Sequence, residues 1–556
     1  MIFPKARFVS ILSLGVASAA LLSGAVQARD DGIGLIETGV ANANLEAGNL
    51  PSATMIDRDF VTELVATGTE PLENPSGVIT RFGLLSNGTR TEPDENTYVK
   101  LENNLVCNGV DYGRNFLFQG HENAGNLAYV TRINLDRKRD DGRRITLLTP
   151  VGADGLTHFN AIDGSTFNPF SNSVLFTQET SANVNGAING TGAVIQISMD
   201  CQARVNTLEA FLGLGAFEGI HPDDHGNVYL AEDAGGLRPG GAATAPETGR
   251  LVPLHAAAQP NTFVYRYLPN NPARLEDGGK LQALQVIIDG VALKFGGVGP
   301  AAAVADIISL AQRKLHAPGT SWPIKWVTIH ESHAGDTLAF NATQAAKDAG
   351  ATPFKRPENL AWLPDSKFGT FFFGPTGDTD APTSQEPELA ARGSWGSLFR
   401  VDLRHEDSGK GPKGKLLDDG TISIFVLGDQ LHNSFDNVAF ANEHQLLAAE
   451  DRGDTLHHQL NALDSVWAFD IDRRQPLATA LRFIALGRDA VAAPDGEEDN
   501  EPTGLFVSNG STRKDEVLGT KKNLDEARAF FTMQHGQNNL FEILRKDKVW
   551  TRMIDQ

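Results

Sequence analysis

The sequence repeats one short unit, in which a turn containing glycine leads into an apolar strand that ends in acidic or small polar residues. Clear examples occupy 172–179, 226–233, 368–378 and 444–454. Short strands separated by turns of Gly, Pro, Asn and Asp indicate an all-β fold. Repetition of a single unit favours a β-propeller over a sandwich. We therefore expect an all-β propeller of about six blades.

One stretch, at about 236–350, interrupts this repeat. It opens with a loop rich in Gly, Pro and Ala, and it contains AAAVADIISLAQRKLHA (301–317), the best helix candidate in the chain. Apolar residues such as Val304 and Ile307 fit a helical stripe. We interpret the stretch as a partly helical insertion over one face of a single propeller domain that spans 71–556.

The N-terminus has the features of an export signal. A positively charged start precedes an apolar run from Phe8 to Val26 that is rich in small residues, and a cleavage site follows at Ala28. The run also approaches the length of a membrane-spanning helix, so a single anchor is the alternative. We expect residues 1–28 to be a cleaved signal peptide and 29–70 to be weakly structured. The mature protein is then periplasmic or extracellular, without stable insertion in a membrane.

The charge and the cysteines narrow the possible partners. The formal net charge is -21, which argues against binding to nucleic acid or to anionic membranes and suits a protein that binds cations. The two cysteines, Cys107 and Cys201, cannot build a zinc-ribbon or iron–sulfur site. In an oxidising compartment they are expected to form a disulfide.

Acidic residues at strand ends are the main chemical signal. In a propeller, strand ends from different blades meet at a central funnel, where carboxylates repel one another unless cations lie among them. Calcium takes oxygen-rich sites of this kind. Glu122 is a candidate, although a surface pair at a capped strand is the alternative. Glu232 and Asp233 are neighbours and so point to opposite faces of a strand. Asp223 and Asp224 fit a turn better than a site.

The segment RPE, Arg356 to Glu358, allows two interpretations. A guanidinium beside a carboxylate can be a structural ion pair, or it can hold a phosphate next to a metal ligand. Spacing alone leaves both open. HESH (330–333) lacks a third zinc ligand, so we expect no zinc there. The absence of Gly-x-Ser-x-Gly, Walker and dinucleotide motifs argues against common serine hydrolases, nucleotide hydrolases and Rossmann dehydrogenases.

Taken in order, the short motifs resemble those of the PhoX-type alkaline phosphatases, which are secreted β-propeller enzymes that use iron and calcium. The resemblance spans about 110–540. It rests on GHE (120–122), FTQE (176–179), FEG (217–219), YLAED (229–233), FVYRYLP (263–269), RPE (356–358), SFDNVAF (434–440), EPTG (501–504) and QHG (534–536).

The resemblance implies hydrolysis of small phosphate monoesters, with metal ions polarising the phosphate. It also implies roles for particular side chains. These are Glu122, Glu218 and Glu358 as iron ligands, Glu179, Glu232 and Asp233 near calcium, and Arg356 on the substrate phosphate.

Position 178 departs from the family pattern. The family carries a cysteine iron ligand where this chain has Gln178, and a neutral amide is a poor substitute for a thiolate at ferric iron. The resemblance therefore supports calcium more strongly than iron. Two alternatives stay open: a calcium-binding propeller without phosphatase activity, and a calcium-dependent hydrolase of lactonase type that uses one metal and a carboxylate base.

Overall fold

The computed structural model describes residues 32–40, 54–180, 192–405, 416–487 and 501–548. The predicted signal peptide lies outside these ranges. Within them, no helix has the length and apolarity needed to cross a membrane.

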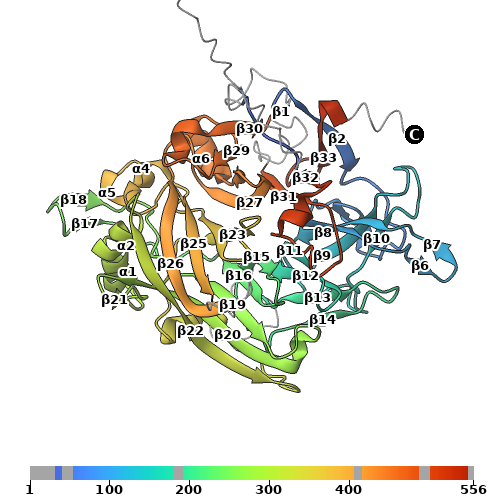
Figure 1. The fold of residues 1–556 in the computed structure, drawn as a ribbon, viewed down its shortest axis with the longest axis horizontal. Coiled ribbons are helices and arrows are strands. Elements are labelled where there is room, and N and C mark those ends of the chain that lie inside the picture. Colours follow the sequence, from blue (N-terminus) through green and yellow to red (C-terminus); the bar gives the residue numbers. More distant parts are fainter. Residues whose placement is uncertain (1–31, 41–53, 181–191, 406–415, 488–500, 549–556) are drawn as a thin grey trace, which may run out of the picture.

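The described chain is built almost entirely from antiparallel strands arranged around a centre (Figure 1). Two sheets have four strands and come from the first half of the chain. One is β5 (Glu92–Lys100), β8 (Asn115–Glu122), β9 (Tyr129–Asn134) and β10 (Ile145–Leu147); the other is β11 (Ile162–Asn168), β12 (Ser173–Gln178), β13 (Ile195–Ser198) and β14 (Val205–Thr207).

The third sheet has ten strands because β22 and β26 pair and so join two propeller units. One unit has β15 (Phe217–Pro222), β16 (Val228–Glu232), β19 (Val264–Pro269) and β20 (Gly278–Ile288), which also pairs with β21 (Val291–Ala292) and β22 (Ser321–His333). The other has β23 (Pro357–Trp362), β24 (Thr370–Pro375), β25 (Ser397–His405) and β26 (Leu416–Leu427).

The last two large sheets each take one strand from the N-terminal part of the chain. In the first, β27 (Phe435–Asn442), β28 (Gln445–Glu450), β29 (Ser465–Asp470) and β30 (Leu481–Ala485) are extended by β1 (Met55–Ile56). In the second, β31 (Pro502–Ser508), β32 (Arg528–Met533) and β33 (Leu540–Arg545) are completed by β2 (Phe60–Ala66). The expectation that 29–70 is weakly structured is therefore wrong for these two strands, whose backbone groups are paired in sheets.

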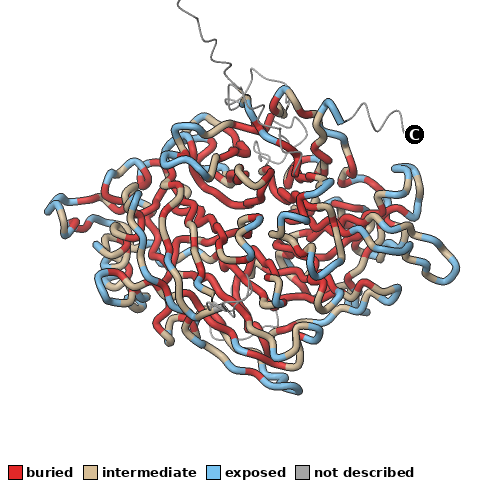
Figure 2. Tube along the Cα trace, viewed as in Figure 1, coloured by how far each residue is buried: buried red, intermediate tan, exposed pale blue. Residues whose placement is uncertain are grey.

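The innermost strands of the units close a ring of contacts in the order β5, β11, β15, β23, β27, β31. This ring confirms the propeller. The six units are distributed over five large sheets rather than over six separate ones, because the pairing of β22 with β26 joins two of them. Apolar side chains fill the space between neighbouring sheets, as in the cluster of Phe60, Phe483 and Phe531. Figure 2 shows this buried interior against more exposed loops at the rim.

The insertion at 236–350 differs from the expectation in two respects. Strands β19 and β20 lie inside this range but belong to the propeller, because they continue the sheet from β16. The helix expected at 301–317 is two helices, α1 (Pro300–Ile307) and α2 (Leu310–Leu315), since Ser309 begins a new helix by accepting a hydrogen bond from the Gln312 amide.

The remaining short elements cover the edges of the propeller. Hairpin β17 (Ala242–Thr244)–β18 (Leu251–Pro253) packs through apolar residues against α1 and α5 (Pro387–Ala390), and these elements lie together at the left of Figure 1. The others are hairpins β3 (Ile79–Arg81)–β4 (Leu84–Leu85) and β6 (Val106–Cys107)–β7 (Val110–Asp111), helices α3 (Ala342–Asp348), α4 (Ala381–Ser384), α5 (Pro387–Ala390) and α6 (Gly453–Leu460), and 3-10 turns η1 (Leu275–Asp277), η2 (Pro476–Thr479) and η4 (Lys521–Leu524).

The expected disulfide is confirmed. Cys107 and Cys201 are bonded and lie 94 positions apart in sequence. The bond ties the β6–β7 hairpin to the turn between β13 and β14, and so links the first two sheets at their outer edge.

Candidate metal and phosphate site

The innermost strands share a local irregularity that builds the centre of the site. In each of them the register with the next strand shifts near the start of the strand. Such bulges leave residues unpaired and redirect side chains, often beside functional sites. In five of the strands the shift contains an acid followed by a second residue. These pairs are Asp94–Glu95, Asp163–Gly164, Glu218–Gly219, Glu358–Asn359 and Asp436–Asn437.

Glycine allows two of these strands to approach their neighbours closely. A Cβ atom added to Gly164 would lie 2.0 Å from the carbonyl oxygen of Glu218, and one added to Gly219 would lie 2.8 Å from the Cα atom of Asn359. Only a residue without a side chain fits such close contacts. The acids that precede these glycines are thereby brought near the acids of the adjacent strand.

The result is a connected series of carboxylates near the starts of the innermost strands. We call this end of the propeller the mouth. The series consists of three groups, and within each group the ligand oxygens lie within 4.8 Å of one another. Asp163 belongs to the first and second groups and Glu218 to the second and third. The groups are Asp94, Glu122 and Asp163; Asp163, Glu179 and Glu218; and Glu218, Glu358 and Asp436. We call these seven residues the acid chain.

The second strands of the units supply the rest of the site. Glu122 is the last residue of β8, Glu179 follows β12, Asp233 follows β16 and Asp451 follows β28. Since the second strand runs antiparallel to the innermost one, its end lies beside the start of that strand. Acids from both strands therefore reach the same mouth.

Burial among like charges perturbs these groups strongly. Burial is the largest cause that raises the pKa well above its ordinary value for Glu122, Asp163, Glu179, Glu218, Glu358 and Asp436, and neighbouring carboxylates add to the effect. Burial also raises the pKa of Asp94 to about 6, even though hydrogen bonds from Thr503 and Gln534 oppose the shift. Carboxylates held in this way bind protons, or they bind cations.

Arg356 is the basic side chain that contacts this region. Its Nε atom lies 2.8 Å from Oδ2 of Asp233, and its Nη2 atom lies 3.4 Å from Oε1 of Glu358 and 4.0 Å from Oδ2 of Asp451. Burial by itself would lower the pKa of Arg356, but these carboxylates outweigh it and raise that pKa. The side chain is 21% exposed. Among the described residues, nothing forms a hydrogen bond with Nη1, so that nitrogen has donors left for a ligand.

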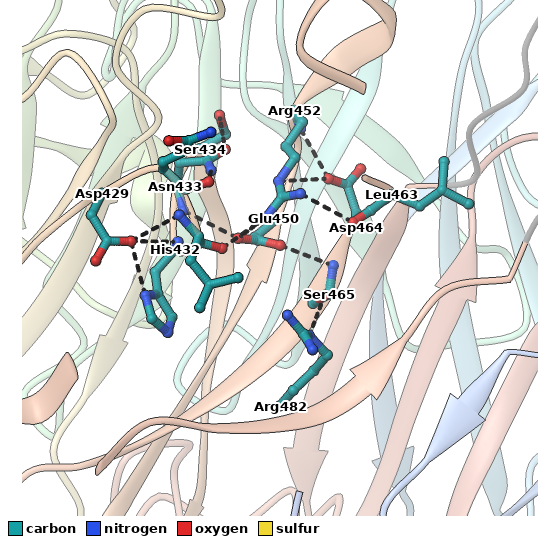
Figure 3. A network of polar contacts seen from close by, with 12 residues as sticks. Asp429, His432, Asn433, Ser434, Glu450, Arg452, Leu463, Asp464, Ser465 and Arg482 are labelled. Atoms are coloured by element: carbon teal, nitrogen blue, oxygen red, sulfur yellow. Dashed lines mark hydrogen bonds and ion pairs between the residues drawn. The ribbon is translucent and has the colours of Figure 1, made fainter. Parts of the chain in front are cut away.

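A buried polar network anchors Glu450 and Arg452, the two residues that flank Asp451 (Figure 3). Its neighbour Arg452 donates from Nη2 to Oε1 of Glu450 at 2.8 Å, and its backbone amide donates to Oδ1 of Asp464 at 3.3 Å. Glu450 also accepts hydrogen bonds from the backbone amides of Asn433 and Ser465. The backbone of Asp451 is therefore held on both sides, and its amide also donates to the carbonyl of Ser434 at 2.8 Å.

The structure brings together most of the residues that the sequence predicted, with two exceptions. Glu122, Glu179, Glu218, Asp233, Glu358 and Arg356 all lie at the mouth. Glu232 does not, because it faces away from Asp233, as expected for adjacent residues of a strand. It accepts hydrogen bonds from the hydroxyls of Tyr265 and Thr343, and burial raises its pKa to about 7.

Gln178 is the second exception. Its Nε2 atom donates to the carbonyl of Ala193 at 2.8 Å, and its Oε1 atom accepts from the amide of Asn160 at 3.1 Å. The amide therefore serves the backbone of its own unit, and only the next residue, Glu179, joins the acid chain. Gln178 lies one position away from the site, on the opposite face of the strand.

Sequence reasoning missed Asp94, Asp163 and Asp436. A signal for Asp163 and Asp436 was present, because an acid followed by Gly or Asn recurs near the start of successive innermost strands, as in DG (163–164), EG (218–219), EN (358–359) and DN (436–437). A fourth acidic group, Asp223, Asp224 and His225, lies at the β15–β16 turn. There Oδ1 of Asp223 accepts hydrogen bonds from the backbone amides of His225 and Asn227, as expected for a turn residue.

Comparisons with known proteins gave one family match and several similar solved structures. A family model described as alkaline phosphatase PhoX matches residues 242–480. The structure of PhoX from Pseudomonas fluorescens in complex with vanadate, a transition state analogue, has a TM-score of 0.50 and 13% identity, and the match covers 91% of this chain and 98% of that chain. A catalytically inactive virginiamycin B lyase from Staphylococcus aureus has a TM-score of 0.30 and 10% identity, covering 82% of this chain and 95% of that chain.

A search of curated protein sequences found no match. The family match confirms the resemblance to PhoX that the ordered motifs predicted, and the PhoX structure confirms the propeller fold.

Proposed function

We propose that this propeller hydrolyses small phosphate monoesters at cations held by the acid chain. The observation that carries the proposal is the position of Arg356, whose guanidinium lies 3.4 Å from Glu358 of the acid chain and whose Nη1 forms no hydrogen bond with a described residue. Phosphate is an anion, so carboxylates alone would repel it. A phosphate site here needs both the arginine and bound cations.

The side chains of the acid chain fit one of the two metals that the family resemblance implies better than the other. The acid chain offers only carboxylate oxygens, which are the ligands that calcium prefers. Both cysteines are in the disulfide, so no thiolate is available for iron. The site therefore fits calcium, and iron would have to be held by carboxylates alone. Glu122, Asp163, Glu179, Glu218 and Glu358 would be the main ligands.

Bound cations would neutralise the carboxylates and polarise the phosphate as Lewis acids. The protein's own side chains then bind and orient the substrate. The Nη1 end of Arg356 would donate to a phosphate oxygen while Asp233 holds the other end of the guanidinium. Thr503 and Gln534 fix Asp94, and Thr376 fixes Glu358, so that the ligands are positioned before substrate arrives. Export by residues 1–28 to the periplasm or the exterior belongs to the same proposal.

The test is hydrolysis of p-nitrophenyl phosphate by the wild type and by Arg356→Ala, each loaded with calcium and iron. A matched control is Arg400→Ala, which removes an arginine that pairs with Asp402 on β25, outside the site. Loss of one charged contact to the transition state corresponds to a fall in kcat/KM of about 100-fold or more. Equal activity of Arg356→Ala and the control would exclude the role of Arg356. Hydrolysis of lactones instead of phosphate esters would support the lactonase alternative.

A further inference from the structure

The residue before Arg356 forms a buried ion pair that no catalytic role explains. Lys355 Nζ contacts Asp378 Oδ2, and the two side chains are only 5% and 2% exposed. Lys355 lies two residues before the innermost strand β23, and Asp378 follows the second strand β24. The pair therefore closes the end of the β23–β24 hairpin, next to the site but outside the acid chain.

The backbone at Arg356 is in a conformation that needs support. Its φ is 56°, in the left-handed region that residues with a side chain rarely adopt. The Arg356 carbonyl accepts a hydrogen bond of 2.9 Å from the amide of Thr376, and the Lys355 carbonyl accepts one of 3.2 Å from the amide of Gly377. Strained backbone of this kind persists when the surrounding contacts fix it, and it is common at functional sites.

Asp378 is itself held by segments from outside the hairpin. Its Oδ1 atom accepts the backbone amide of Ala258 at 2.9 Å, in the segment after β18. Its own amide donates to the carbonyl of Ser394 at 2.8 Å, after α5. The carboxylate that binds Lys355 is thus fixed by two further segments, one of which belongs to the 236–350 stretch.

We propose that Lys355 and Asp378 are a positioning pair, which holds Arg356 in its left-handed conformation and aims its guanidinium at the substrate phosphate. This inference rests on the proposed function and deepens it. Neither residue touches the substrate. The pair acts through the backbone of Arg356, and it links the orientation of that side chain to the segments around Ala258 and Ser394.

The experiment measures binding of inorganic phosphate to the metal-loaded full chain by calorimetry, together with kcat, KM and Tm. Three variants are compared: Asp378→Asn, Lys355→Met, and the double variant Lys355→Met/Asp378→Asn. Each single variant leaves one buried charge without its partner, whereas the double variant removes both charges and so restores stability. The control, Glu542→Gln, breaks the ion pair between Arg528 and Glu542 in a different sheet.

We expect the double variant to recover most of the lost Tm while still binding phosphate about tenfold more weakly, with KM raised by a similar factor, as when one charge-assisted hydrogen bond is misaligned. The control should lose Tm without losing phosphate affinity. If the double variant binds phosphate as tightly as the wild type, the pair is only structural and the inference is overturned. If the wild type itself binds no phosphate, the proposed function fails, which is a distinct result.

Discussion

Removal of divalent cations should destabilise this protein to an extent that can be worked from the acid chain. The three carboxylate groups provide up to three cation sites. A ligand at about 100 times its Kd stabilises the folded state by about 2.7 kcal/mol per site, so three sites give about 8 kcal/mol. Sharing of Asp163 and Glu218 between groups makes this sum an upper value. With an unfolding entropy of about 2.1 cal/mol/K per residue, about 500 residues give about 1 kcal/mol/K.

The expected difference in Tm between calcium and a chelator is therefore about 8 °C, measured by calorimetry or near-ultraviolet circular dichroism. Glu218→Gln alters two of the three groups and should reduce the calcium-dependent shift to about 3 °C. Glu232→Gln is the matched control, because Glu232 is a buried acid of the neighbouring strand outside the acid chain. It should keep the full shift. Equal Tm values in calcium and in chelator would refute the reasoning, as would equal shifts in the two variants.

Three further predictions test the burial and the packing of the site and the disulfide at the outer edge of the propeller. Burial raises the pKa of Glu95 to about 8 from 4.5, so the metal-free protein should lose stability as pH rises from about 4.5 to 8, and Glu95→Gln should flatten that slope in urea titrations; an unchanged slope would contradict it. Gly164→Ala should cost more than about 3 kcal/mol in the same assay, because its Cβ would strike the carbonyl of Glu218; a loss below about 1 kcal/mol would exclude the close approach. Replacing Cys107 and Cys201 by alanine should cost about 4 to 5 kcal/mol, as expected for a closed loop of this length, and an unchanged unfolding midpoint would show that the bond does not stabilise the fold.

The strand pattern predicted the fold well because each unit carries its own local signal. An apolar run that ends in an acid shows both a strand and the end that reaches the mouth, which is how Glu122, Glu179 and Asp233 were found. The alternation of side chains along a strand also anticipated that only one of Glu232 and Asp233 would serve the site. These inferences need only neighbouring residues.

Other features depend on contacts between distant segments and were not predictable from local patterns. The pairing of β1 with β30 and of β2 with β33 joins the two ends of the chain, and the residues of β1 and β2 look unremarkable in sequence. The pairing of β22 with β26, which joins two units into one sheet, is equally long-range.

The acids of the innermost strands were missed for a different reason. Asp163 and Asp436 lie near the start of a strand, not at its end. Their side chains reach the mouth because a bulge redirects them. The position of Gln178 was also misjudged, because a shift of one residue along a strand moves a side chain to the opposite face.

The most direct test of the account is release of phosphate from p-nitrophenyl phosphate by the purified mature protein, with its metal content determined on the same sample. The account predicts activity that accompanies bound calcium, disappears on chelation and returns when cations are restored. Absence of phosphate release from fully metal-loaded protein would contradict it. Activity that survives complete removal of the cations would contradict the assigned role of the acid chain.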